Sequence, residues 1–288
     1  MKVNYYIENK NISFKFIGVF DNGEDTQLIS EDADLFKRCK KANGGFLIHK
    51  IFKKKEIDKL SHYVSLKMKQ ILKNELKKNI QHFKMEKYHE YVSDEEHLLV
   101  LKKMGLGWST DDFPFSFSII EKRMSSLLKM KVSAWAKHIK KQHKKELAIN
   151  NIISRKPSIF SIRIVRPMCH TDCNPPHKDA WIERLRNGIN IYAPLCGSTK
   201  ESSLPLVPDS HHLNENVILR TIGKYKFNGV SYTVPVALSI NNNDISLIRP
   251  NPKIGQALIF SPYLIHGGAY NFEKNKTRFS LECRFWLC

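Results

Sequence analysis

From Ile159 to the C-terminus the chain is a series of short runs rich in β-branched and aromatic residues. The runs read FSIRIV, INIYAPL, VSYTVPVAL, ISLI, QALIFS and TRFSLECRFWL, with Pro, Gly, Asn and Asp between them. Several short strands at close spacing, separated by turn residues, are typical of an antiparallel sandwich or jelly roll. We therefore predict a jelly-roll core in residues 156–288.

The first half of the chain shows helical spacing instead. Apolar residues recur at helical intervals in residues 53–90 and 118–148. They include Ile57, Leu60, Val64 and Met68, and later Met124, Leu127, Leu128, Val132 and Trp135. With 288 residues, of which 42% are hydrophobic, the chain can bury one large core. The prediction is a single α+β domain over residues 1–288, mainly β at its core, in which a helix-rich part (1–155) braces the sheet.

Basic residues outnumber acidic ones by 47 to 28, a formal charge of +19 that directs attention to nucleic acid and other anionic partners. The excess is spread along the chain, because residues 1–150 carry +11 and residues 151–288 carry +8. Lysine supplies 36 of the 47 basic residues, whereas specific nucleic-acid binders favour arginine on one element. We interpret the charge as a solvated surface, predict no nucleic-acid partner, and keep the charge only as a weak indication of the sign of the substrate.

The sequence carries no recognisable targeting signal. No run approaches the ~18 apolar residues of a membrane helix, and no apolar signal region follows the start MKVNYYIENK. The six cysteines form no C-x-x-C pair, which indicates reduced thiols rather than a disulfide framework or a zinc ribbon. These features predict a cytoplasmic protein without a membrane span.

Two H-x-D tripeptides stand in the stretch MCHTDCNPPHKDAW, residues 168–181: His170 with Asp172 and His177 with Asp179. Positions i and i+2 of an extended segment project to one face, so the His and Asp of either pair can ligate one metal ion. The candidate third ligand is His266, which ends an apolar run before Gly267-Gly268. Two imidazoles and one carboxylate leave three metal positions open, as in non-haem Fe(II) oxygenases.

A candidate anion clamp follows the third ligand. Arg278 and Ser280 alternate onto one face of the run TRFSLECRFWL. A guanidinium beside a hydroxyl suits the distal carboxylate of a keto acid. The other end of a keto acid can fill two of the three open metal positions, and dioxygen the third.

In four places the chain resembles the phytanoyl-CoA dioxygenase-like (PhyH) family of Fe(II)/2-oxoglutarate-dependent oxygenases. These are 45–48 (GFLI) followed by 56–60 (EIDKL), 175–181 (PPHKDAW), 208–211 (PDSH), and 266–268 (HGG) followed by Arg278-x-Ser280. They span residues 44–286. The resemblance implies a double-stranded β-helix, also called a jelly roll, with Fe(II), the co-substrate 2-oxoglutarate and O2 at its site. The departure is Asp209, which stands where the family has glycine.

The resemblance also helps to choose between the two H-x-D pairs. The family places its P-G-S-H loop about thirty residues after the metal-binding pair. Pro208 follows Asp179 by 29 residues and Asp172 by 36. The metal ligands implied are His177, Asp179 and His266, and the alternative role for His170 and Asp172 is stabilisation of a loop.

For several other polar residues the sequence allows two different roles. The resemblance places Tyr192 and Asn190 near 2-oxoglutarate, and core packing is the alternative for Tyr192. Arg284 would bind a substrate anion or, as we favour, form a structural salt bridge. Arg163 and Arg166 face either the cavity or the surface.

The function predicted is hydroxylation of a small polar molecule, anionic or sugar-like, with release of succinate and CO2. Hydroxylation is favoured because Asp179 is present, whereas the halogenating relatives replace this carboxylate with a small residue. The alternatives are a jelly-roll protein that binds a metal or ligand without redox chemistry and a nucleic-acid-associated protein.

Overall fold

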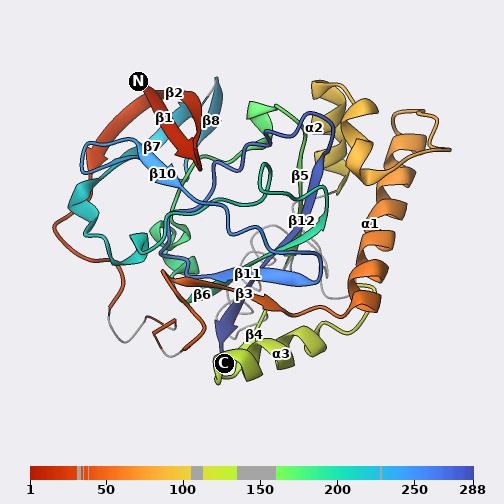
Figure 1. Cartoon of the computed structure of the whole chain (residues 1–288). Coiled ribbons are helices and arrows are strands. Elements are labelled where there is room, and N and C mark those ends of the chain that lie inside the picture. Colours follow the sequence, from red (N-terminus) through yellow and green to blue (C-terminus); the bar gives the residue numbers. More distant parts are fainter. Residues whose placement is uncertain (31–33, 35, 38, 105–112, 135–159, 228) are drawn as a thin grey trace, which may run out of the picture.

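Two six-stranded sheets dominate the computed structural model (Figure 1). It describes residues 1–30, 34, 36–37, 39–104, 113–134, 160–227 and 229–288. The first sheet has the order β10-β1-β2-β7-β8, with β9 also paired to β7. Its strands are β1 (Lys2–Ile7), β2 (Lys10–Asn22), β7 (Ile218–Phe227), β8 (Val230–Tyr232), β9 (Ala237–Ile240) and β10 (Ile245–Leu247).

The second sheet carries the prospective site. Its order is β3-β11-β6-β12-β4, and β5 pairs with β12. The strands are β3 (Phe46–Lys50), β4 (Val132–Ser133), β5 (Phe160–Val165), β6 (Gly188–Cys196), β11 (Gln256–Phe260) and β12 (Arg278–Leu287). All of its pairings are antiparallel.

The two faces of the second sheet differ because successive side chains of a strand point to opposite sides. On β12 the residues Phe279, Leu281, Cys283 and Phe285 join the larger hydrophobic core. The alternate β12 residues are Arg278, Ser280, Glu282 and Arg284. β6 repeats the pattern, with Ile189 and Ile191 in that core and Asn190 and Tyr192 on the polar face. One face of the sheet therefore packs against the hydrophobic core, and the other face carries the polar and charged residues.

Helices cover the apolar face of the second sheet. They are α1 (Lys54–Asn74), α2 (Asp94–Met104) and α3 (Ser118–Leu128), and in Figure 1 they lie on the side away from β1 and β2. On α1 the buried residues are Ile57, Leu60, Val64, Met68 and Leu72, the spacing of one helix face. Arg123 of α3 donates to both carboxylate oxygens of Glu56 on α1, at 2.6 and 2.8 Å, and so joins the two helices.

The predicted strands are confirmed, with one division. FSIRIV, INIYAPL, ISLI, QALIFS and TRFSLECRFWL become β5, β6, β10, β11 and β12. VSYTVPVAL is split into β8 and β9 around Pro235, which has no N–H for a ladder hydrogen bond. The structure is mainly β, as expected, with two sheets and few helices.

The elements of the N-terminal part differ from the expected helical stretches in three respects. The chain begins with the hairpin β1–β2, whose alternate residues such as Tyr5 and Phe14 are buried, and β2 pairs with the unpredicted strand β7. The first helical stretch, predicted over 53–90, ends as an α-helix at Asn74. The second ends at Leu128, because Lys129 turns left-handed (φ +54°), and Val132 lies in β4. The rest of that stretch, 135–148, lies outside the described residues.

Short 3-10 helices occupy the connections that carry the motifs. They are η2 (Met85–Glu90), η4 (His170–Asp172), η5 (Asp179–Trp181), η6 (Glu183–Leu185), η7 (Ser210–His212) and η8 (Glu215–Val217). Within the described ranges, no helix has both the length and the apolar character that a bilayer crossing requires.

Candidate active site

The backbones of His177 and His266 lie directly opposite each other. The N–H of His177 donates to the carbonyl of His266 at 2.8 Å, and the N–H of His266 donates back at 2.9 Å. Gly267 allows this approach, because a Cβ on it would lie 2.8 Å from the carbonyl oxygen of Pro175 and 3.1 Å from Nδ1 of His177. Its φ of +112° also favours glycine. Two histidines 89 positions apart in the sequence are thus brought together.

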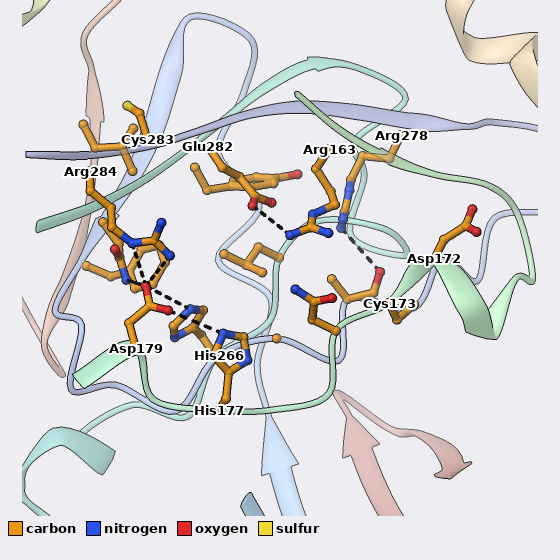
Figure 2. Close-up of a pocket in the computed structure, with 18 residues that line it drawn as sticks. Arg163, Asp172, Cys173, His177, Asp179, His266, Arg278, Glu282, Cys283 and Arg284 are labelled. Atoms are coloured by element: carbon orange, nitrogen blue, oxygen red, sulfur yellow. Dashed lines mark hydrogen bonds and ion pairs between the residues drawn. The ribbon is translucent and has the colours of Figure 1, made fainter. Parts of the chain in front are cut away.

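Asp179 completes a three-residue cluster with these histidines (Figure 2). Its Oδ1 lies 3.6 Å from Nε2 of His177, and its Oδ2 lies 4.0 Å from Nε2 of His266. One potential ligand atom from each residue falls within 4.8 Å of the others. Two imidazole nitrogens and a carboxylate oxygen at this spacing can bind a single metal ion.

Hydrogen bonds fix which nitrogen of each histidine faces the cluster. Nδ1 of His177 lies 2.8 Å from the carbonyl oxygen of Pro175, and Nδ1 of His266 lies 2.9 Å from that of Leu264. A carbonyl only accepts, so Nδ1 carries the hydrogen in both rings and the Nε2 lone pairs face Asp179. Burial, helped by the neighbouring His177, lowers the pKa of His266 to about 4, so that ring is neutral. Neutral imidazole is the form that binds metal, so the donor set fits a metal ion.

Three donors converge on one oxygen of Asp179. Asn190 Nδ2 lies 2.9 Å from Oδ2, and Arg284 reaches the same atom with Nε at 3.0 Å and Nη2 at 2.7 Å. Burial alone would raise the pKa of this carboxyl group, but the charge of Arg284 and the contact with His177 hold it well below its usual range. The carboxylate is ionised, and Oδ1 remains for the metal. Asn190 donates to Asp179 and also lines the pocket, so its predicted place near 2-oxoglutarate stays a prediction. Of the two readings of Arg284, the structural salt bridge is confirmed.

The cluster lies at one end of a pocket with about 620 Å³ of empty space, which includes its mouth. Besides the cluster, the lining includes Asn174, Tyr192, Leu204, Phe260 and Arg278. Figure 2 shows Arg278 across the cavity from Asp179. The prospective metal ligands and the prospective anion clamp therefore belong to one cavity.

Arg278 is 1% exposed, and not all of its N–H groups have a hydrogen-bond acceptor. Its Nη1 donates to the backbone oxygens of Ser202 and Ala269, whereas its Nε has no partner in the structure. The buried hydroxyl of Ser280 is likewise without a hydrogen bond. Unpaired buried donors are costly, and a carboxylate in the cavity would accept hydrogen bonds from Arg278. Ser280 itself is not among the residues that line the pocket.

Tyr192 lies beneath the clamp. Its ring is fully buried, with the Arg278 guanidinium carbon 5.7 Å from the ring centroid. Its hydroxyl is 2.8 Å from Oγ of Ser198, so that group already has a partner. The side chain thus packs in the core and lines the pocket with its ring.

The second H-x-D pair has a structural role. Asp172 is buried against Arg166, with Nε and Nη2 of the arginine at 2.9 Å from its two oxygens. His97 Nε2 lies 3.5 Å away. The ring of His170 packs on that of Tyr270, with centroids 4.5 Å apart. The loop-stabilising reading of this pair therefore fits the structure, and Arg166 faces Asp172.

The PDSH loop supports the strand segment that carries His266. Asp209 adopts φ +59°, the left-handed conformation that glycine would take there, so the substitution leaves the turn intact. The Ser210 hydroxyl accepts a hydrogen bond from the N–H of Ile265 at 2.8 Å. The buried ring of His211 packs on Gly45, where a Cβ would come within 2.7 Å of its Cε1. Two of the four resemblance motifs are thus in contact.

Sequence reasoning missed one charged pair at the site. Lys178, between the two ligands, is 0% exposed, and its Nζ lies 2.6 Å from Glu215 Oε1. Trp181 Nε1 at 2.7 Å and Arg220 Nη1 at 3.0 Å donate to the other oxygen of Glu215. Burial lowers the pKa of Lys178, and Glu215 opposes that effect. No sequence signal joins the two residues, because Glu215 lies 37 positions away.

Comparisons with known proteins give only distant structural similarity. No protein-family model and no curated protein matches the chain. Apo EctD from S. alaskensis is similar at 13% identity and a TM-score of 0.42, over 93% of this chain and 80% of that one. EvdMO1 is similar at 13% and 0.44 over 88% of this chain and 50% of that one. AviO1 from Streptomyces viridochromogenes Tue57 is similar at 12% and 0.42, over 91% and 96%. EctD has also been solved with bound Fe and with 2-oxoglutarate and 5-hydroxyectoine. At these TM-scores the similarity does not by itself identify a fold or an activity.

Proposed function

We propose that this protein is an Fe(II)/2-oxoglutarate-dependent dioxygenase that hydroxylates a small polar molecule. The observation that carries the proposal is the cluster of His177, Asp179 and His266, with both Nε2 lone pairs turned toward the carboxylate. A pocket that ends on the unsatisfied guanidinium of Arg278 supports it further.

Each residue has a defined task. His177 and His266 present Nε2, and Asp179 presents Oδ1 while Arg284 and Asn190 hold Oδ2. Arg278, which lines the pocket and has a buried Nε without a partner, holds the distal carboxylate of 2-oxoglutarate. Ser280, expected in the same clamp, is not among the lining residues and stays a prediction. When bound, Fe(II) and 2-oxoglutarate supply the reduction of O2: one oxygen atom enters succinate as CO2 is lost, and the other enters a C–H bond of the substrate. The chain positions that C–H bond and limits the access of water.

We further propose that residues 1–288 form one domain with a double-stranded β-helix core. Isolated bridges between His177 and His266, Leu206 and His266, and Leu206 and Ile248 support this arrangement. They pair, in strand-like fashion, residues of segments that lie between the named strands. The hairpin β1–β2 lies between β10 and β7 in the first sheet.

The proposal is tested by succinate formation. The full chain, supplied with Fe(II) and 2-oxoglutarate in air, should release succinate even without the primary substrate, at a slow rate. Asp179→Ala should abolish this release, and the exposed-histidine variant His82→Ala should not. Release from Asp179→Ala at the wild-type rate would refute the ligand assignment. An iron-loaded wild-type protein that makes no succinate would instead favour a metal-binding protein without redox chemistry.

A further inference from the structure

A second charged pair lines the pocket away from the metal cluster. Arg163 on β5 lies directly opposite Ser280 on β12, so Arg163 and Glu282 are diagonal neighbours on the polar face of the second sheet. Arg163 Nη2 lies 3.5 Å from Glu282 Oε2, and the side chains are 37% and 27% exposed. Figure 2 shows the pair between Arg284 and Arg278. Both side chains are thus accessible from the cavity.

Most of the ionic side chains around the cavity already have a partner of opposite charge. The described ionic residues in its lining are Arg163, Asp172, Asp179, Arg278, Glu282 and Arg284. Asp172 is paired with Arg166, Asp179 with Arg284, and Glu282 with Arg163. Arg278 donates to backbone carbonyls, and under the proposed function its charge meets 2-oxoglutarate. At the Arg163–Glu282 end of the cavity a charged group would therefore meet an opposite charge that already has a partner.

The Arg163–Glu282 pair offers one set of donors and one set of acceptors side by side. A guanidinium only donates hydrogen bonds and a carboxylate only accepts them. Two neighbouring hydroxyl groups meet both needs at once, because one accepts from Arg163 and the other donates to Glu282. The ion pair stays intact in that arrangement, whereas an amino acid would have to separate it.

We propose that Arg163 and Glu282 recognise two neighbouring hydroxyl groups of an uncharged polyol such as a sugar ring. This inference rests on the proposed function and narrows its substrate class.

The experiment compares probes of different charge on the iron- and 2-oxoglutarate-loaded full chain. The neutral probes are a panel of methyl glycosides and inositols. The charged probes are glucuronate, glucosamine and a set of free amino acids, and succinate formation is measured for each. A neutral glycoside should give the highest kcat/KM, at least tenfold above glucuronate and glucosamine. Its deoxy analogue, which lacks one of the two hydroxyls, should lose at least tenfold.

Variants of Arg163 and Glu282 test whether this pair causes the preference for a neutral glycoside. Arg163→Gln and Glu282→Gln should each lower kcat/KM for the best glycoside at least tenfold, change the affinity for 2-oxoglutarate less than threefold, and no longer distinguish the glycoside from its deoxy analogue. The exposed-lysine variant Lys253→Gln should behave as wild type. The inference is overturned if a uronate, an amino sugar or an amino acid is the best probe. It is also overturned if no neutral probe accelerates a protein that already binds 2-oxoglutarate and releases basal succinate. Loss of that basal reaction would instead count against the proposed function.

Discussion

Arg284 places two of its nitrogens, Nε and Nη2, on the same oxygen of Asp179, at 3.0 and 2.7 Å. Asn190 adds a third donor to that oxygen. Arg284 stands six residues after Arg278 on β12, so one strand face supplies both the prospective co-substrate clamp and the residue that orients the carboxylate ligand. The side chain of Asp179 is 4% exposed, so its charge depends on this partner.

We expect Arg284 and Asp179 to be energetically coupled in the metal-free protein. Arg284→Met leaves a buried carboxylate with fewer donors and should lower the free energy of unfolding by about 2 kcal/mol. In the Asp179→Asn background the same change should cost less, giving a coupling energy of at least about 1 kcal/mol in a double-mutant cycle by urea denaturation. The exposed-arginine variant Arg184→Met is the control and should be neutral. Additive effects would contradict the coupling.

The buried pair of Lys178 and Glu215 should matter far more than an exposed one. Lys178→Met removes a fully buried counter-charge and should destabilise the protein by about 3 kcal/mol. Lys10 is paired with Glu201 at the surface, where the side chains are 50% and 40% exposed, so Lys10→Met should cost less than about 1 kcal/mol. Chemical denaturation of both variants measures the contrast, and equal costs would show that the buried pair carries no special weight.

Gly267 should be required for the metal site rather than for the fold alone. An added Cβ would press on Nδ1 of His177, so Gly267→Ala should weaken Fe(II) binding at least about tenfold, or about 1.4 kcal/mol. Gly223 is the matched control, because it also has a positive φ but no atom within 4 Å of the added Cβ. Gly223→Ala should cost stability without changing the affinity for Fe(II), as measured by anaerobic titration. An unchanged affinity in Gly267→Ala would contradict the account of the His177–His266 approach.

His97 should make the fold sensitive to acid. Burial lowers the pKa of this histidine from 6.5 to about 4, with Asp172 opposing and Arg166 assisting the shift. The unfolded chain therefore takes up a proton before the folded protein does, and the free energy of unfolding falls as the pH drops from 6.5 toward 4. The contribution of His97 to this loss is up to about 3 kcal/mol.

Urea midpoints at about pH 7 and about pH 4.5 measure that contribution. His97→Gln should lose less stability between the two conditions than the wild type, and the exposed-histidine control His82→Gln should match the wild type. Identical pH dependence in His97→Gln and the wild type would assign the acid sensitivity to other groups.

The strands of the second half could be predicted because their alternation is local. In TRFSLECRFWL, polar and apolar residues alternate, and the structure places Arg278, Ser280 and Arg284 on one face and Phe279 and Leu281 on the other. The two H-x-D pairs were visible for the same reason. Local spacing did not reveal the pairing of β2 with β7, because about two hundred residues separate these strands.

The sequence could not predict which residues of the site would form hydrogen bonds and ion pairs with one another. Asn190 was expected near the co-substrate and is hydrogen-bonded to Asp179, because the register of β6 against β12 puts it opposite Arg284. Lys178 stands between two predicted ligands in the sequence, and in the structure it forms an ion pair with Glu215. Such contacts depend on sheet register and loop packing, which become known only when distant segments meet.

The central claim is tested most directly by anaerobic titration of the full chain with Fe(II) and then 2-oxoglutarate. The account predicts one Fe(II) per chain and a visible metal-to-ligand charge-transfer band when 2-oxoglutarate is added. His266→Ala should lose the iron and the band together, whereas Arg278→Met should keep the iron and require at least tenfold more 2-oxoglutarate. A wild-type protein fully loaded with Fe(II) that gives no band at saturating 2-oxoglutarate would contradict the account.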